Sequence, residues 1–472
     1  MRFSTRRLRP VHAAAALVLI GSAASVRAQD RASNAAARKD VSLTIYNNDL
    51  SLIRERRSIP TQSGVYRLRY EDVTTGVDPA TVHLQPLGSG ALHLVEQNYE
   101  YDLISRAKLM EKYVGREVGY RTKEGTYGRA KLLASNEGYV YDLDGKIVFE
   151  LPGDVVLDAI PQELIATPTL VWTLDAKSAG DRDVEVTYLS RGFSWRADYV
   201  LLLEESEAKA GLTGWVTLDN QSGGSFRNAE LKLVAGDVNR VQQMFDKGIE
   251  MQAMATDGGR RPQFQEESLF EYHLYTLERR TDVLDRQQKQ VLFFDAEGVA
   301  ITKGYTYRSA PHVVLAQGYR SNDAEPVEVT LSFKNASDNG LGQPIPQGIV
   351  RVYKHDRKGT PQFLGENRVR HTPKDETLEF SVGRAFDIVG KHVQTDFQRI
   401  DDHVIESAVE VELRNHKDAS VQVAVEEMLH GDWEILESSH PAVKKDATTA
   451  VFTLPVPANG KTMLTYRVRL RT

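Results

Sequence analysis

The chain contains no cysteine among its 472 residues. Structural disulfides and membrane attachment through a lipidated cysteine are therefore excluded. It also lacks the run of roughly 20 apolar residues that a transmembrane helix needs, because the run from Ala13 to Ala24 is shorter and no later stretch approaches it. We therefore expect a soluble mature chain, long enough to bury its cores without covalent cross-links.

Residues 1–28 have the composition of a secretory signal peptide. They carry five arginines, no acidic residue and a central apolar run, and they end in Val26-Arg27-Ala28. This pattern predicts cleavage after Ala28 and a periplasmic or secreted protein. Arg6-Arg7 leaves a twin-arginine export route open, but Arg9-Pro10 stands where apolar residues are expected, so the general secretion route is favoured.

Basic residues are the minority once the signal peptide is removed. Its cleavage leaves 54 of the 59 basic residues against all 65 acidic residues. A chain of net negative charge is poorly suited to the phosphate backbone, so nucleic acid is not an expected partner. The roughly 440 remaining residues suggest about three domains.

Helical periodicity is scarce, and the dominant pattern has period two. Alternate side chains of a strand point to opposite faces, so a strand with one buried face needs apolar residues only at every second position. The alternating apolar residues near the two ends of the mature chain are Val41, Leu43, Ile45, Val409, Val411 and Leu413. The sequence therefore predicts an all-β protein.

One short helix is predicted from Leu103 to Tyr113. Its apolar face consists of Leu103, Ala107 and Met110. Closely spaced turns follow the helix, and these turns are Lys123-Glu124-Gly125, Asn136-Glu137-Gly138 and Asp144-Gly145. Short apolar runs between such turns favour a meander that closes into a small SH3-like or Sm-like barrel over residues 103–160.

This segment resembles the Sm-like RNA-binding barrels, in which a helix precedes five strands. Gly115, Val118 and Gly125 stand in comparable places. Ala130 stands where that family usually has glycine, and the residues that stack on bases and contact RNA are not evident. We therefore interpret the segment as a structural barrel rather than an RNA-binding site.

Three strand-like segments end in asparagine, at Asn220, Asn335 and Asn415. Asparagine suits such a position because its side chain bonds nearby backbone groups and tolerates left-handed geometry. Three copies at unequal spacing favour related sandwich modules over a solenoid. The last module ends with a turn at Asn459-Gly460 and an alternating apolar strand, an ending that is common in bacterial immunoglobulin-like sandwiches. The apolar residues of this strand are Leu464, Tyr466, Val468 and Leu470.

The predicted architecture is a series of immunoglobulin-like β-sandwich modules with a small inserted β-barrel that carries one short helix. Its divisions are the signal peptide at 1–28, a flexible N-terminal tail at 29–40, N-terminal strands at 41–102, the barrel at 103–160, a central sandwich at 161–374 and a C-terminal sandwich at 375–472. Residues 242–265 lose periodicity and are rich in Gln, Asp, Gly, Met and Arg. This composition favours a mobile loop, and its Met and Phe residues leave a partner surface open as the alternative.

The nearest approach to a catalytic motif is Gly192-Phe193-Ser194-Trp195. A nucleophilic serine at a strand-to-helix elbow needs glycine two residues later, followed by a helix. Arg196 occupies that place, and the apolar residues after it alternate as in a strand. We therefore interpret Ser194 as a strand or turn residue, and Trp195 and Tyr199 as packing residues.

Patterns for metal ions are equally weak. The densest groupings are Asp401-Asp402-His403 and the pair His392 and Asp396, whose spacing is not diagnostic, so solvated loop positions are favoured. Asp142-Leu143-Asp144-Gly145 begins like a calcium loop but lacks the downstream acidic ligand, which favours a hairpin turn.

Gly460-Lys461-Thr462 ends like a phosphate-binding loop, but Pro455 stands in place of the first glycine and no helix is expected, so we predict a hairpin here too. The polar run His371–Glu376 is interpreted as a linker between modules. The sequence therefore assigns no catalytic, cofactor-binding or metal-binding residue, and it implies no cofactor.

Longer ordered motifs resemble a bacterial family of secreted proteins. They include "YLSRGFSWRADYVLLL", "PIPQGIVRVYK", "HTPKDETLEFSVGRAFDIVG" and "VPANGKTMLTYRVRL", and the likeness covers most of Leu170–Arg471. The family is defined as a domain of unknown function and is shared with the C-terminal part of mucoidy-inhibitor-like proteins. Those relatives carry a long coiled coil where this chain has the predicted barrel. The resemblance implies a secreted all-β protein and supplies no reaction, ligand or catalytic residue.

The leading hypothesis is an exported cell-envelope β-sandwich protein that acts by binding, as a scaffold or assembly factor, with an envelope protein or glycan as its partner. The alternative is a hydrolase that acts on envelope glycan or peptide with carboxylates from distant strands. A cleft with two facing acids, or an Asp/His cluster, would favour the enzyme. The sequence does not determine the oligomeric state.

Overall fold

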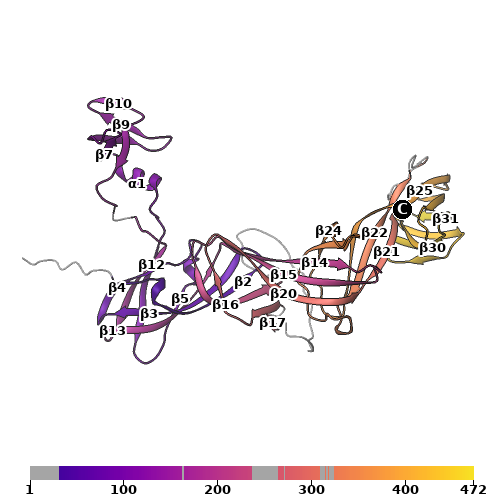
Figure 1. The fold of residues 1–472 in the computed structure, drawn as a ribbon, viewed down its shortest axis with the longest axis horizontal. Coiled ribbons are helices and arrows are strands. Elements are labelled where there is room, and N and C mark those ends of the chain that lie inside the picture. The colour runs from indigo at the N-terminus through magenta and orange to yellow at the C-terminus, as the bar shows by residue number, and fades with distance from the viewer. Residues whose placement is uncertain are drawn as a thin grey trace, which may run out of the picture.

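The computed structural model describes residues 31–161, 164–236, 264–269, 272–308, 314, 317 and 324–471. Figure 1 shows an elongated molecule in which layers of strands follow one another along the long axis, while a small unit stands away from one end. Within the described ranges there is one α-helix, α1 (Arg106–Tyr113). The prediction of an all-β protein built from tandem β-sandwiches is confirmed.

Two sheets form the N-terminal part of the molecule. A four-stranded sheet has the order β1 (Arg31–Ser33), β4 (Gly64–Glu71), β12 (Thr169–Ala176) and β6 (Leu92–Glu100). An eight-stranded sheet has the order β17 (Phe264–Leu269), β18 (Tyr272–Leu277), β16 (Phe226–Ala235), β2 (Arg38–Tyr46), β3 (Leu50–Thr61), β13 (Gly180–Ser190) and β5 (His83–Pro86), with β19 (Thr281–Val283) paired to β16.

Three further sheets complete the fold. The small unit contains β10 (Lys146–Val148), β9 (Val140–Leu143), β8 (Tyr127–Ala134), β7 (Glu117–Thr122) and β11 (Gly153–Val156). The central sheet contains β20 (Gln287–Ala300), β15 (Lys209–Asn220), β14 (Phe193–Leu203), β23 (Gly348–His355) and β24 (Pro361–Val369). The C-terminal sheet contains β28 (Asp432–Ser438), β31 (Gly460–Arg471), β26 (Val404–Asn415), β25 (Thr377–Arg399), β22 (Glu325–Lys334), β21 (Thr302–Arg308), β27 (Val421–Met428), β30 (Thr449–Val456) and β29 (Ala442–Lys444).

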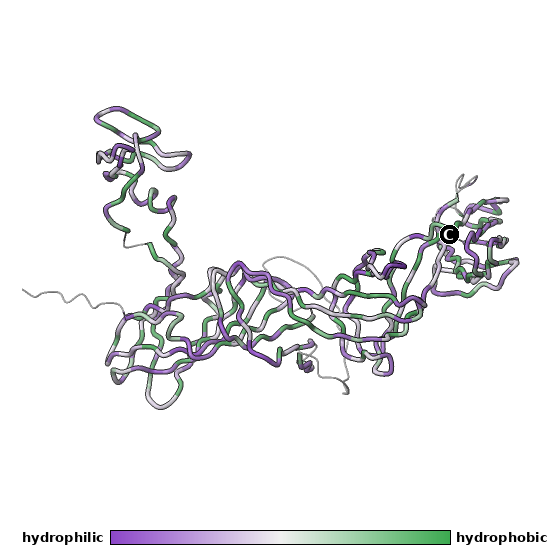
Figure 2. Tube along the Cα trace, viewed as in Figure 1, coloured by the Kyte–Doolittle hydropathy of each residue, from purple (hydrophilic) through white to green (hydrophobic). Residues whose placement is uncertain are grey.

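One continuous core, the first core, joins the eight-stranded sheet to both the four-stranded and the central sheet. Tyr70 of β4 stacks on Trp172 of β12 with ring centroids 4.7 Å apart, and Phe264 of β17 meets Phe293 of β20 at 5.8 Å, all within the same buried cluster. The alternating residues at 41–45 lie in this core, as predicted. Figure 2 shows the same alternation of hydrophilic and hydrophobic residues along the strands.

The C-terminal sheet folds over itself to enclose the second core. Phe452 of β30 stacks on Tyr466 of β31 with centroids 5.2 Å apart, although the two strands lie near opposite ends of the strand order. The predicted apolar faces at 409–413 and 464–470 are buried here. The predicted hairpin at Gly460 is wrong, because β30 pairs with β27 and β31 with β26, so the turn carries the chain from one layer to the other.

The two cores share strands β22 and β25, of which β25 is the longer. Leu378 and Phe380 of β25 belong to the first core, whereas Ala385 and Ile388 of the same strand belong to the second. The predicted module boundary at 374/375 falls just before β25. The predicted linker is a turn held by hydrogen bonds, in which the backbone N–H of Asp375 donates to the carbonyl of Asn335 at 2.7 Å. A continuous strand, rather than a flexible linker, therefore connects the cores.

The three strand-ending asparagines have equivalent roles. Asn220, Asn335 and Asn415 are each no more than 1% exposed. In each, Nδ2 donates to a carbonyl beyond the turn and Oδ1 accepts a backbone N–H inside it. The carbonyl acceptors are Gly224, Gln343 and Ala419 at 2.9, 2.8 and 2.9 Å, and the N–H donors are Ser222, Gly342 and Lys417, each at 3.0 Å. None of the three has positive φ, so their selection reflects backbone bonding rather than left-handed geometry.

The predicted flexible tail at 29–40 is corrected over its described part. Residues 31–33 form β1, which pairs in parallel with β4, and Ser33 is buried. The 3-10 helix η1 (Ala35–Ala37) follows, and β2 begins at Arg38. The signal peptide at 1–28 lies outside the described residues, as does the loop at 242–265 except for its last two residues, which begin β17.

The chain between β6 and β12, residues 101–168, forms the small unit of Figure 1, and we call it the insert. Its helix begins at Arg106, later than predicted, because Ser105 is the N-cap and its Oγ accepts the N–H of Lys108 at 3.1 Å. Met110 of the helix packs into the core of the insert, but Ala107 is exposed, so the predicted apolar face is only partly correct.

The sheet of the insert is open. Among the described strands, the edge strands β10 and β11 pair only with β9 and β7 respectively, so the predicted closed barrel does not form. Strands of three and four residues at the edges leave too few backbone groups to complete the ring. The prediction of a hairpin at Asp144-Gly145 is confirmed, since both residues have positive φ and link β9 to β10.

Candidate functional site

Ser194 lies on β14 and is exposed, opposite Asp219 of β15. Its neighbours Trp195 and Tyr199 are 5% and 2% exposed and belong to the first core. The structure therefore agrees with the interpretation of Ser194 as a strand residue and of the two aromatic residues as packing residues.

The predicted metal-type groupings are not assembled into one site. The interpretation of His392 and Asp396 as solvated loop residues is wrong, because both lie on β25 and His392 is buried, with its Nε2 3.4 Å from Oε1 of Glu427. Asp396 accepts a hydrogen bond from Arg467 at 2.8 Å. Asp401-Asp402-His403 forms an exposed turn. Over the described ranges, no three His, Asp or Glu residues are grouped so that they could hold a metal ion.

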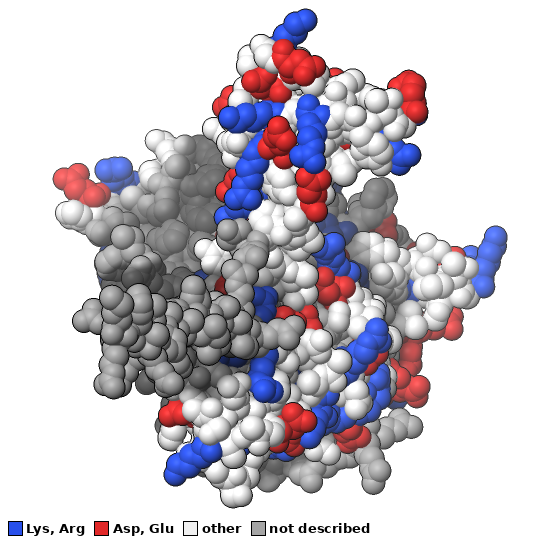
Figure 3. All heavy atoms as spheres, turned by 90° about the vertical axis from the view of Figure 1, so that its left-hand side faces the viewer, with Lys and Arg blue, Asp and Glu red and all other residues white. Residues whose placement is uncertain are grey.

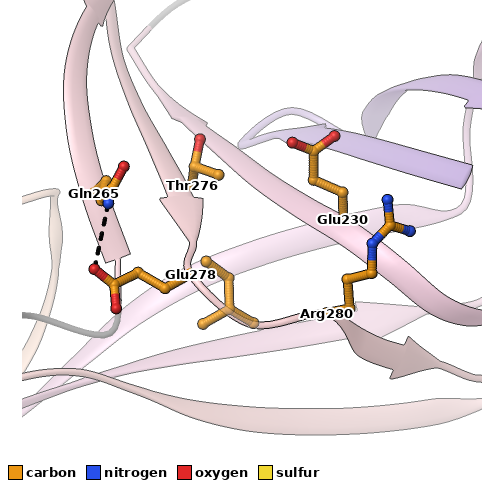
Figure 4. A pocket seen from close by; sticks show the side chains of 6 residues that line it. Glu230, Gln265, Thr276, Glu278 and Arg280 are labelled. Carbon is orange, nitrogen blue, oxygen red and sulfur yellow. Dashed lines mark hydrogen bonds between the residues drawn. The ribbon is translucent and has the colours of Figure 1, made fainter.

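A shallow groove of about 620 Å³ lies beside the β17–β18 hairpin. It is lined by Glu230 of β16, Gln265 of β17, Thr276 and Leu277 of β18, and Glu278 and Arg280 of the segment after β18. Figure 4 shows these side chains along the hairpin, with Glu278 directed toward Gln265. The groove is predominantly polar and therefore suits a hydrogen-bonding ligand better than an apolar one.

The charges of this groove are partly neutralised by neighbouring strands. Arg280 donates through Nη2 to Asp40 of β2 at 2.6 Å, and Lys232 Nζ lies 3.4 Å from Glu230. Glu278 accepts a hydrogen bond from Gln265 at 3.4 Å. In Figure 4 the carboxylates of Glu230 and Glu278 point in different directions, so they do not form the facing pair that glycoside chemistry needs.

Sequence reasoning missed this groove, because its residues come from three strands and a turn. Glu230 and Glu278 are 48 positions apart. Glu230 fits the polar positions of an alternating strand, and Glu278 fits the turn after a strand. No local signal distinguishes them from other exposed acids.

Charged residues on the outer face of the central sheet form a ladder across its strands. Asp198 of β14 is 6% exposed and accepts hydrogen bonds from Thr217 of β15 at 2.7 Å and from Arg351 of β23 at 3.0 Å. Arg351 also donates to Glu366 of β24 at 3.1 Å.

Figure 3 shows basic and acidic residues interleaved over the described surface at the end of the molecule near the insert.

A buried charge cluster lies between the four-stranded and eight-stranded sheets. Glu55 and Arg57 of β3 are both fully buried, and Arg57 Nη2 donates to Glu55 at 2.8 Å. Tyr70 donates its hydroxyl to the same carboxylate at 2.9 Å, and Arg38 donates to it at 2.6 Å. Arg57 also donates to the carbonyl of Glu71 at 2.6 Å and lies over the ring of Tyr70.

This cluster keeps Glu55 ionised. Burial alone would raise the pKa of Glu55, but the positive charges of Arg57 and Arg38 and the hydroxyl of Tyr70 hold that pKa below its ordinary value. Because its groups bond one another and nearby backbone, the cluster ties β3 to β4 and to the N-terminal strand β2. We interpret it as a structural tie rather than a ligand site.

Comparison of the sequence with models of known families and with curated proteins gives no match. No helix in the described ranges is long and apolar enough to cross a membrane. The fold and its groove define an all-β protein of tandem sandwiches that carries a small inserted sheet.

Proposed function

We propose that this protein is exported to the cell envelope and acts there by binding, as a scaffold or assembly factor that presents the insert to an envelope protein or glycan. The shared strand is the observation that carries the proposal. The 23 residues of β25 contribute to both cores, and at about 3.3 Å per residue they give this strand a contour length of about 75 Å. A single strand that runs through both cores suits a protein that holds its partners apart, and the register of β25 with β22 shifts only where it passes from one core to the other.

The position of the insert also supports a binding role. It begins after β6 and ends before β12, which are antiparallel neighbours, so two adjacent strands lead to it and away from it. Of the nineteen exposed large apolar side chains in the described part of the chain, nine lie in this small unit. They are Tyr101, Ile104, Val114, Tyr127, Leu133, Ile147, Phe149, Val156 and Ile160. Exposed apolar residues gathered in one unit are typical of interaction surfaces.

The export signal at residues 1–28 and the resemblance to a secreted bacterial family support the proposed location. Both come from the sequence, and both remain predictions. Fractionation of cells into cytoplasm, periplasm and medium, combined with N-terminal sequencing, measures the location and the cleavage site directly.

Crosslinking mass spectrometry on the tagged protein in its native envelope tests the binding role. The matched variant joins Glu100 to Thr169, a registered pair at the ends of β6 and β12, through Asn-Gly and so removes the insert alone. We expect the intact chain to recover one defined envelope component. We expect the variant to recover at least about tenfold less of that component, a change that corresponds to about 1.4 kcal/mol. Equal recovery with both chains would contradict the proposal.

The hydrolase alternative rests on one observation, namely that Glu230 and Glu278 line the same groove, although their carboxylates do not face each other (Figure 4). Incubation of the purified protein with envelope glycan and peptide fragments tests it, with Glu278→Gln as the variant and Glu204→Gln, at an exposed position outside the groove, as the control. Turnover that Glu278→Gln alone abolishes would replace the binding proposal. Absence of turnover would leave binding as the better account.

A further inference from the structure

Strand β10 is an open edge at the tip of the insert. It pairs with β9 on one side and has no partner strand on the other among the described residues. Figure 1 places it at the outermost point of the insert, away from the sandwiches. An unpaired strand edge is a template on which another strand can add through backbone hydrogen bonds.

The backbone of β10 has donors and acceptors on this open side. A two-residue hairpin loop is flanked by a hydrogen-bonded pair, which here is Leu143 and Lys146. Because hydrogen-bonded and non-bonded pairs alternate, the next residue, Ile147, directs its N–H and C=O away from β9. Phe149 follows in the same phase, although the chain bends after Val148. A partner strand that also pairs with Phe149 and Glu150 would therefore lengthen β10 at its C-terminal end by these two residues.

Two side chains of this segment expose apolar surface at the open edge. Ile147 is 59% exposed and Phe149 is 73% exposed, and the segment contains neither proline nor glycine. Lys146 and Glu150, at its two ends, are exposed, and neither forms an ion pair with another residue in the described part of the chain. Two exposed apolar residues and the two opposite charges at the ends of the segment thus remain available to a partner.

We infer that β10 pairs with β10 of a second copy of this chain, antiparallel about a two-fold axis at Val148. In this register Lys146 lies opposite Glu150 of the second copy, and Glu150 lies opposite its Lys146. Ile147 lies opposite Phe149 of the second copy, a pairing of β-branched and aromatic residues that stabilises antiparallel sheets. The sequence Lys-Ile-Val-Phe-Glu is therefore complementary to itself, and the two open sheets become one continuous sheet with an isologous interface.

The inference goes beyond the proposed binding role, because it concerns the purified protein alone. Sedimentation velocity of the full mature chain over a range of concentrations measures the association. A contact of about five residues a side is small beside a standard interface, so we expect a reversible, concentration-dependent dimer rather than a permanent one.

Charge reversal distinguishes this register from any other contact. Lys146→Glu alone or Glu150→Lys alone places like charges opposite each other at both ends, and we expect each to weaken the dimer by about tenfold or more. An equimolar mixture of the two single variants restores both ion pairs and should associate as the unmodified chain does. The double variant, Lys146→Glu with Glu150→Lys, should also associate. Lys123→Glu makes the same charge change in an exposed turn and should have no effect.

A cysteine at the axis gives a second measurement, since the natural chain contains none. Val148→Cys places one thiol beside its symmetry mate in a non-hydrogen-bonded pair, the close pair of an antiparallel ladder, so mild oxidation should yield a covalent dimer of the full chain. Lys123→Cys should yield much less. A monomer at every concentration, no recovery in the mixture of charge variants, or equal crosslinking of the two cysteine variants would overturn the inference.

Discussion

The tandem sandwiches, which we call the rod, bury their apolar residues more completely than the insert does. The rod encloses two large cores, whereas the buried core of the insert consists of six of its described residues: Met110, Tyr113, Val118, Ala130, Leu132 and Tyr141. Small units bury a smaller fraction of their surface, so apolar residues remain outside. The difference teaches that the rod is organised for stability, while the insert retains open edges and apolar surface available for contact.

Tryptophan makes this comparison measurable. The four tryptophans are Trp172, Trp195, Trp215 and Trp433, and all of them lie in the rod. Tryptophan fluorescence therefore reports unfolding of the rod alone, and amide hydrogen exchange can report the insert separately.

The largest expected effect is on the rod, from the substitution Glu55→Gln. The neutral amide leaves Arg57 buried without its counter-charge, and breaking a buried ion pair in this way costs about 3–5 kcal/mol. Urea unfolding followed by tryptophan fluorescence should show a large fall in the midpoint. The control is Glu185→Gln, whose carboxylate bonds Arg54 and Arg56 near the surface of the same sheet and should cost about 1 kcal/mol or less. Equal effects of the two substitutions would contradict the structural role of the buried cluster.

A core truncation in the insert should leave the rod intact. Leu132→Ala removes a fully buried side chain of β8, at an expected local cost of about 2–5 kcal/mol. Amides of β7, β8 and β9 should then exchange faster, while the tryptophan unfolding curve stays unchanged. A shift of the tryptophan midpoint comparable to that of Glu55→Gln would show that the two regions unfold as one unit.

The smallest expected effect concerns pH. Burial alone would raise the pKa of Glu207, but hydrogen bonds from Lys303 and Lys354, at 2.5 and 2.6 Å, lower it from 4.5 to about 2. A lowered acid pKa stabilises the folded state fully above the unfolded value, and this stabilisation is lost as the pH falls toward the folded value. The unmodified chain should therefore exceed Glu207→Gln in stability by about 1 kcal/mol near neutral pH.

This difference should shrink as the pH falls from 4.5 toward about 2. Fluorescence-monitored urea titrations at several pH values measure it. Glu204→Gln, at an exposed position of the same turn, is the control and should show no such pH dependence. A difference that persists unchanged to the lowest pH would mean that Glu207 does not act through its charge.

Much of the fold could be predicted because strand patterns are local. Alternation marks the buried faces at 41–45, 409–413 and 464–470, and the asparagine at the end of each of three strands marks a turn that it bridges by bonds over two to eight residues. One further local signal was available: Glu55 and Arg57 occupy the apolar phase of β3 between Ile53 and Ile59, all of them buried. A charged pair in the phase that faces a core predicts a buried cluster.

The sequence by itself determined the all-β class, the buried faces at 41–45, 409–413 and 464–470 and the hairpin at Asp144-Gly145, because side-chain alternation and turn preferences act over a few residues. Only the tertiary structure decided that the cores share β25, that β30 and β31 lie in opposite layers, that the insert stays open and that Glu230 and Glu278 line one groove. Those features depend on which strands pair and which sheets face each other across long separations in the sequence. Many strands of similar pattern could pair in many ways, and the packing of the whole chain selects one of them.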